Sequence, residues 1–322
     1  MWLVRAVHIA ATVLLAGGYL FWLLVLDRRG ADGPRTDIAR WLRRLRGWSL
    51  CIATLSWLMW LGLVAAGMSG RPLGDLLGGD VLGAVLIRTT FGHVWLARFV
   101  MMVGLMLLLA LGRRREAERP GGLGGLLATG LLAALAGTGH AVGTEPSMRL
   151  AHLAADAAHL LAAGLWLGAL APLLFVLARA HANPAPPWSS LAAKATERFS
   201  SLGILAVATL LATGLINASL LLGDATAILA TPYGRLLALK LTLFALIVAI
   251  AAVNRSVLRP RLPLSGDWSA GARIAARQLW RNALFELLLG AAILAIVGAL
   301  GTTEPPRHMH SADPGMGHHG GS

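Results

Sequence analysis

The chain has 322 residues, of which 57% are hydrophobic and only 13% are charged, and its mean hydropathy is +0.69. Soluble domains carry about 25% charged residues, so this composition argues against a soluble enzyme, a disordered chain and a disulfide scaffold. The formal net charge of +13 could indicate a nucleic-acid partner. In so apolar a chain we interpret it as loop charge that sets membrane orientation, and we expect no nucleic acid. The single cysteine, Cys51, excludes an internal disulfide and a multi-thiolate metal site.

Apolar runs of about twenty residues recur along the whole chain and predict membrane-spanning helices. Hydrocarbon offers no partner to a backbone amide, so each span must be helical. We therefore predict an all-α polytopic membrane protein, with eight transmembrane helices at residues 2–26, 48–68, 93–112, 122–140, 150–177, 199–222, 235–253 and 283–300. The first span is too long for a signal peptide, and we expect it to be retained.

The basic residues alternate between the two sides of these spans. The loops after the first, third, fifth and seventh spans hold seven, four, three and six Lys or Arg residues. The opposite side holds Arg71, Arg88, Arg149 and Arg307, with Arg235 at a boundary. Positively charged loops stay in the cytoplasm, so both termini are predicted to lie outside.

Short patterns that recur in order along the chain indicate an internal duplication. An offset of 144 residues relates Arg5, His8 and Trp22 to Arg149, His152 and Trp166, and an offset of 142 relates Arg98 to Lys240. We predict two parallel four-helix halves, residues 1–143 and 144–300, followed by a tail at residues 301–322. The alternative is coincidence among helices rich in Leu, Ala and Gly.

Histidines gather near one predicted depth, close to the outer face: His8, His93, His140, His152 and His159. In the fifth span His152, Asp156 and His159 are spaced i, i+4 and i+7, which places them on one stripe of a helix. Trp166 continues that stripe inwards. Imidazole binds copper and zinc, and a neighbouring carboxylate can fix its tautomer. We expect a metal site made by these histidines with Asp156 and Trp166 beside it. The alternative is a set of wet interfacial histidines and a polar pair that packs helices.

Four other polar residues lie in the spans. Arg98 and Lys240 are expected to reach the outer surface, unless one of them pairs with Asp156. Asn217 is expected to hydrogen-bond across helices, and Glu286 to face the region of Arg281. We interpret all four as structural.

The tail after Leu300 is polar and rich in Gly and Pro, so we expect it to be disordered. It carries His308, Met309 and His310, a combination that suits copper in either oxidation state. We favour a mobile arm that captures metal over an inert polar tail.

Several of these segments together resemble the copper-resistance D (CopD) family of bacterial inner-membrane proteins. The segments are residues 139–141, 156–172, 198–200, 231–240 and 254–255, together with Glu286. The resemblance implies an eight-helix protein of copper homeostasis in the bacterial inner membrane, so the outer side predicted for both termini is the periplasm. It also implies a periplasmic copper carrier of the CopC type as a separate partner, and it places the family's histidine motifs on His140, His152 and His159.

Three functions follow from these expectations. The first is binding of copper at the periplasmic face and its import, without ATP, because the sequence has no phosphate-binding Walker loop. The second is electron transfer through a b-type haem, held for instance by His8 with His152 or by His93 with His159. The third is hand-over of copper to a membrane oxidase during its assembly. None of them makes the chain an enzyme in its own right.

Overall fold

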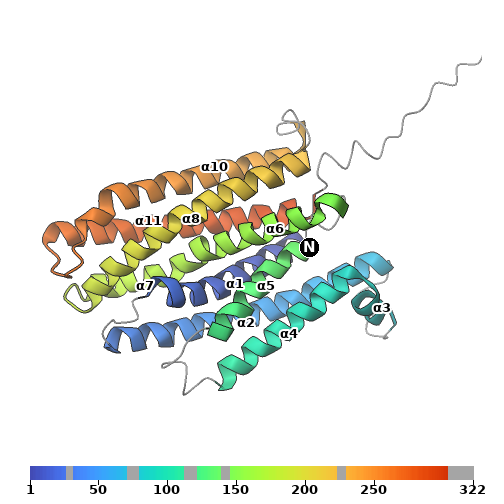
Figure 1. Ribbon diagram of the computed structural model, residues 1–322, viewed down its shortest axis with the longest axis horizontal. Helices are drawn as coiled ribbons and strands as arrows, with labels where there is room; N and C mark the ends of the chain where they lie inside the picture. Colours follow the sequence, from blue (N-terminus) through green and yellow to red (C-terminus); the bar gives the residue numbers. More distant parts are fainter. Residues whose placement is uncertain (27–31, 71–79, 112–121, 139–145, 223–229, 304–322) are drawn as a thin grey trace, which may run out of the picture.

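The computed structural model describes residues 1–26, 32–70, 80–111, 122–138, 146–222 and 230–303. These residues form a bundle of long helices that run side by side, up and down along one axis (Figure 1). The all-α fold predicted from the apolar runs is confirmed. Three residues after Leu300 are described, so most of the predicted tail, with His308, Met309 and His310, lies outside the described residues.

The amino-terminal half begins with a helix that ends in a π-helical turn. Its elements are α1 (Trp2–Leu20), η1 (Phe21–Val25), α2 (Asp32–Ser69), α3 (Asp80–Arg88), α4 (Thr90–Leu111), α5 (Gly122–Ala133) and η4 (Ala134–Thr138). The short helix α3 replaces part of a predicted loop, and it packs on α4.

The carboxy-terminal half has the same order of long helices. Its elements are α6 (Pro146–Ala163), η6 (Gly164–Gly168), α7 (Ala169–Ala182), α8 (Trp188–Leu222), α10 (Pro232–Val253), η7 (Asn254–Leu258), η8 (Arg259–Arg261) and α11 (Ala270–Leu300). The predicted fifth span is thus α6 and α7 joined by the π-helical turn η6. Pro172, inside α7, has no amide hydrogen for the carbonyl of Gly168 four residues earlier, which favours an irregular turn here.

Seven of the helices in the described part are long and apolar enough to cross a membrane. The eighth predicted span is present as a shorter apolar helix, Gly122–Thr138. Three of the long helices extend beyond the predicted spans at the basic end, namely α2, α8 and α11. The added segments carry exposed basic residues, such as Arg43, Lys194 and Arg273, and hydropathy alone therefore placed the helix starts too late.

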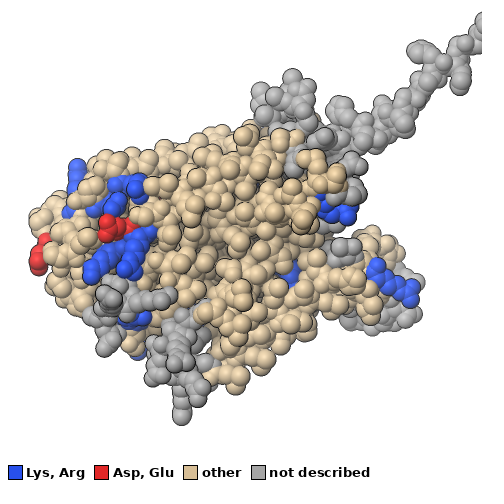
Figure 2. All heavy atoms as spheres, in the orientation of Figure 1, with Lys and Arg blue, Asp and Glu red and all other residues tan. Residues whose placement is uncertain are grey.

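The two ends of the bundle differ in charge. In Figure 2 the described Lys and Arg residues gather mainly at the end where α7 meets α8 and α10 meets α11. The first residues of α1 and the last of α11 lie together at the opposite end: a Cβ atom at Gly298 would lie 2.6 Å from the carbonyl oxygen of Trp2. Both ends of the described chain therefore lie on one side, and the positive-inside rule predicts that this side is the periplasm.

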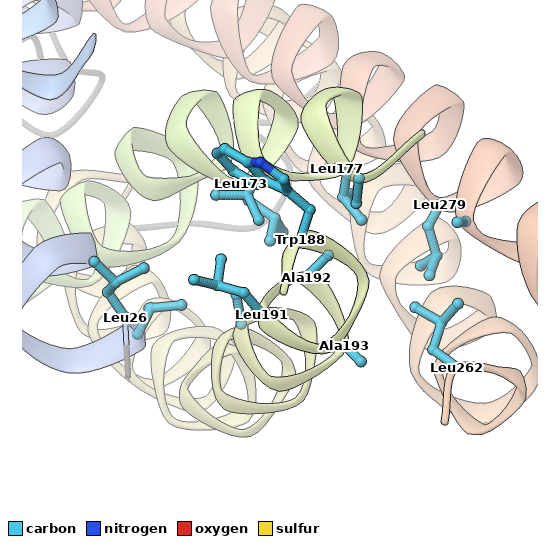
Figure 3. Packing of buried hydrophobic residues seen from close by; sticks show 14 of the residues in the cluster. Leu26, Leu173, Leu177, Trp188, Leu191, Ala192, Ala193, Leu262 and Leu279 are labelled. Carbon is cyan, nitrogen blue, oxygen red and sulfur yellow. The ribbon is translucent and has the colours of Figure 1, made fainter. Parts of the chain in front are cut away.

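The basic end is closed by a core of large apolar side chains. Leu26, Leu173 and Leu177 meet Trp188 and Leu191 at the start of α8, and Leu262 and Leu279 complete the cluster (Figure 3). This core ties α1 and α7 to α8 and α11, and it holds the inner ends of both halves together.

Helix α1 crosses η6 at a point where two backbones touch. A Cβ atom at Gly17 would lie 2.1 Å from the carbonyl carbon of Gly168, and one at Gly168 would lie 2.2 Å from the carbonyl oxygen of Val13. Small residues at such a crossing let transmembrane helices pack backbone to backbone.

Two local features occur at matching places in the predicted halves. The π-helical turns η1 and η6 carry Trp22 and Trp166, which are 144 residues apart. The hydroxyl groups of Thr89 and Thr231 accept hydrogen bonds from the amides of Gly92 and Gly234, at 2.9 and 3.0 Å. These correspondences support the duplication, which stays a prediction.

We predict that Gly17→Ala lowers the free energy of unfolding by about 1–3 kcal/mol, because the added methyl group overpacks the crossing with Gly168. Thermal unfolding in detergent micelles measures the change. Gly47→Ala is the matched control, since a Cβ atom there meets nothing within 4 Å. Equal stability of the two variants would contradict the contact.

Candidate metal site

The histidine stripe predicted on the fifth span lies on α6. The side chain of His152 is 1% exposed, and its Nε2 lies 3.9 Å from a carboxylate oxygen of Asp156. One turn further on, Nδ1 of His159 lies 2.9 Å from the hydroxyl oxygen of Thr213 on α8. The hydroxyl of Thr213 donates its own hydrogen to the carbonyl of Thr209, so Nδ1–H of His159 donates to Thr213. That tautomer leaves the lone pair on Nε2 of His159 available to a ligand.

Two further helices add polar groups to α6. Asn217 of α8 donates a hydrogen bond of 2.5 Å to the Asp156 carboxylate, which confirms the predicted bond across helices. Lys240 of α10 interacts electrostatically with both Asp156 and His159. Lys240, and not Arg98, is thus the basic residue near Asp156. We call His152, Asp156, His159, Thr213, Asn217 and Lys240 the α6 group.

His8 belongs to a different set of contacts, between α1, α2 and α4. Its Nδ1 lies 3.0 Å from the carbonyl oxygen of Ala53 and 3.0 Å from the hydroxyl of Ser56, and its Nε2 accepts a hydrogen bond from the guanidinium of Arg98. The side chains of His8 and Arg98 are both completely buried. We call His8, Ser56 and Arg98 the α1 group.

The α1 group uses both nitrogens of its histidine. Nδ1–H donates to α2, and the lone pair on Nε2 holds Arg98, so a metal or haem iron on His8 would have to displace Arg98. Arg98 was expected to reach the outer surface, but it does not. Its guanidinium group lies over the ring of Trp95, with 5.3 Å between the guanidinium carbon and the ring centroid. Its Nε and Nη1 have no hydrogen-bond partner among the described residues. Removing His8 would therefore leave a buried cation with fewer contacts.

The other predicted ligands do not join these groups in the described part of the chain. His93 is exposed, and its Nε2 lies 2.9 Å from the carbonyl oxygen of Ile87. His140 lies outside the described residues. Trp166 is buried and meets Phe244 edge to face, with 6.0 Å between ring centroids. Nowhere in the described ranges do three His, Cys, Asp or Glu side chains come close enough to hold a metal ion. His8 thus lies apart from His152 and His159, and a site at His152 and His159 needs movement or a further ligand.

Two of the residues in these groups were not predicted. Thr213 lies four residues before Asn217 in an apolar helix, so the spacing of the two polar residues indicates one face of α8. Ser56 gives no such signal, because a lone serine is common in membrane helices. Glu286 accepts a hydrogen bond of 2.7 Å from Asn254, which differs from the predicted position facing Arg281.

Two family models match the chain. The one described as "Copper resistance protein D-like, N-terminal domain" matches residues 1–150, and the one described as "Copper resistance protein D" matches residues 193–300. The chain belongs to the copper resistance protein D family. The resemblance inferred from residues 139–286 is therefore confirmed.

Three relatives match most of the chain. "Inner membrane protein YebZ" of Escherichia coli is 33% identical over 94% of this chain and 97% of its own length, and "Copper resistance protein D" of Pseudomonas syringae is 30% identical over 91% and 93%. "Copper transport protein CutJ" of Bacillus subtilis is 24% identical over 84% of this chain, which covers 50% of that protein. No solved structure gives a significant match.

We predict that His8 and Arg98 are energetically coupled by about 1.5–3 kcal/mol, the range for a hydrogen bond to a charged group. A double-mutant cycle of His8→Ala and Arg98→Met, followed by unfolding in micelles, measures the coupling. The control cycle pairs His8→Ala with Arg46→Met, because Arg46 bonds to the carbonyl of Gly18. A coupling as small as that of the control, within about 0.5 kcal/mol, would contradict the buried contact.

Proposed function

We propose that this protein binds copper at the periplasmic face of the inner membrane and imports it, and that the α6 group is the first binding site for the ion among the membrane helices. The observation that carries the proposal is the arrangement of His152, Asp156 and His159 on one stripe of α6, in the half of the bundle next to the chain ends. Membership of the copper resistance protein D family indicates that the ion is copper. The similarity to the inner membrane protein YebZ supports a place in the inner membrane, and the similarity to the copper transport protein CutJ supports transport.

The chemistry of the two groups favours α6 over α1. His8 has both nitrogens engaged, whereas His159 keeps Nε2 available. His152 and His159 are two turns apart on α6, about 10.5 Å along the helix axis, so their two rings would have to turn towards each other to share one ion. Asp156 then sits where it can orient a ring and offset the positive charge of copper.

Lys240 places a positive charge in the α6 group, so copper must compete with this charge for Asp156. An ammonium group near Asp156 balances the carboxylate while the site is empty of metal. A bound copper ion would repel Lys240, so we expect the lysine to withdraw when the ion arrives. The affinity of this site for copper is therefore lower than that of two imidazoles and a carboxylate without the lysine. A lower affinity favours release of the ion to the next step of transport.

The proposed orientation in the membrane determines which parts of the protein face the periplasm. With the basic end in the cytoplasm, the α6 group and the tail with His308, Met309 and His310 both face the periplasm. There a soluble copper carrier of the CopC type could deliver the ion to the tail or directly to α6. The lipid bilayer covers the apolar outer surface of the helices.

We predict that the double variant His152→Ala/His159→Ala loses copper uptake into proteoliposomes and binds Cu(I) at least about tenfold more weakly, because two imidazole ligands are removed. A competition titration with a chromogenic chelator measures the affinity, and loading of sealed vesicles measures the uptake. The control is His181→Ala, a histidine exposed at the basic end. Uptake in the double variant equal to that of the control would remove the α6 group from the mechanism.

We predict that removing residues 304–322 raises the copper concentration that gives half-maximal uptake and leaves the maximal rate unchanged. A tethered arm raises the local concentration of its cargo and does not alter the later steps. The matched control keeps the length of the tail and replaces its His and Met residues with Ala. If that control behaves like the intact protein, the tail does not capture copper.

A further inference from the structure

A cavity of about 350 Å³ lies at the inner continuation of the α6 group, between α8, α10 and α11. Trp166 of η6, seven residues beyond His159 of α6, lines it. Glu286 of α11 lines it too, and its side chain is only 2% exposed. The cavity thus joins the stripe that carries the α6 group to a buried carboxyl group.

A line of amide side chains connects Glu286 to the basic end of the bundle. Gln278, which is exposed, donates to Asn282 at 2.9 Å, Asn282 donates to Asn254 at 2.6 Å, and Asn254 donates to Glu286 at 2.7 Å. Asn254 opens the π-helical turn η7, and such turns are frequent at functional sites. The amides mark a polar route by which water can approach Glu286 from outside the bundle.

The charged groups around the cavity leave Glu286 without a cationic partner. Arg255 donates to the carbonyl and hydroxyl oxygens of Ser200, each at 2.9 Å, and Arg259 pairs with Glu197 at 2.8 Å. The lining residues from η6 and α7 are all apolar. Among described residues Asn254 is therefore the one hydrogen-bond partner of Glu286. A buried carboxylate without a cation is costly, and taking up a proton removes that cost.

The cavity offers copper no strong ligand. None of its lining residues is His, Cys or Met, and carboxylate and amide oxygens are poor ligands for a soft ion. We propose that Glu286 is a proton-binding site reached from the basic end of the bundle, and that its loading and release of a proton are coupled to passage of the metal ion from the α6 group. The coupling rests on the proposed copper transport, whereas the proton site does not.

The step is a simple exchange of one proton. The carboxylate of Glu286 accepts a proton from water at the basic end and becomes neutral, and it returns the proton to water when it ionises again. A neutral Glu286 leaves the cavity uncharged, whereas an ionised Glu286 attracts a cation moving inwards past Trp166. The charge of this one residue would thus decide when the inner part of the path accepts a positive ion.

Infrared difference spectroscopy of the full-length protein in lipid, recorded over a pH series without copper, tests the proton site. We expect a carbonyl band of a protonated buried carboxyl group that titrates with pH, is absent in Glu286→Gln and persists in Glu197→Gln. Gln keeps the shape of the side chain and an oxygen for Asn254. A titrating band that is unchanged in Glu286→Gln, or no such band in the unmodified protein, would overturn the proposal.

Proteoliposomes that contain a pH-sensitive dye test the coupling. We expect Cu(I) uptake to respond to an imposed pH gradient and to be accompanied by proton movement. Both effects should be lost in Glu286→Gln and retained in Glu286→Asp, which keeps a carboxyl group. Both should also be unaffected in Glu197→Gln. Copper uptake with the same response in all four proteins would overturn the coupling. If none of the four takes up copper, the proposed transport fails, and the infrared titration alone decides whether Glu286 binds a proton.

Discussion

Every ionisable side chain placed in hydrocarbon must find its partner within the protein, and this constraint organises the interior of the bundle. Arg98 lies against His8, Lys240 lies near Asp156 and His159, and Glu286 accepts a hydrogen bond from Asn254. Each arrangement joins at least two helices. The polar interior therefore fixes how the helices are placed, and the same contacts determine which groups remain able to bind an ion.

The two predicted halves use matching positions differently. At the offset of 144 residues Thr12 corresponds to Asp156, and the hydroxyl of Thr12 only donates to the carbonyl of His8 on its own helix. A carboxylate is thus present in the α6 group, whereas the matching position of α1 carries a hydroxyl. We interpret the α1 group as a structural counterpart of the α6 group, because Arg98 binds the Nε2 atom of His8. The α6 group is the one suited to a metal ion.

The sequence was sufficient for the helices and for the stripe on α6, because hydropathy and helical spacing are local properties. A hydrogen bond from Asn217 across helices was also predictable, since an amide in an apolar helix needs a partner, but its partner Asp156 was not. The separation of His8 from His152 was not predictable. Equal depth does not specify direction around a helix, and direction is set by close contacts such as that of Gly17 with Gly168. The cavity beside Glu286 depends on how α8, α10 and α11 diverge, which no local pattern encodes.

X-ray absorption spectroscopy of the protein loaded with one equivalent of Cu(I) tests the central claim most directly. If copper binds to the α6 group, scattering from imidazole rings appears in the unmodified protein, persists when His8 is replaced by Ala, and disappears when His152 and His159 are both replaced. Imidazole scattering that disappears with His8, and survives without His152 and His159, would contradict the assignment of copper to α6.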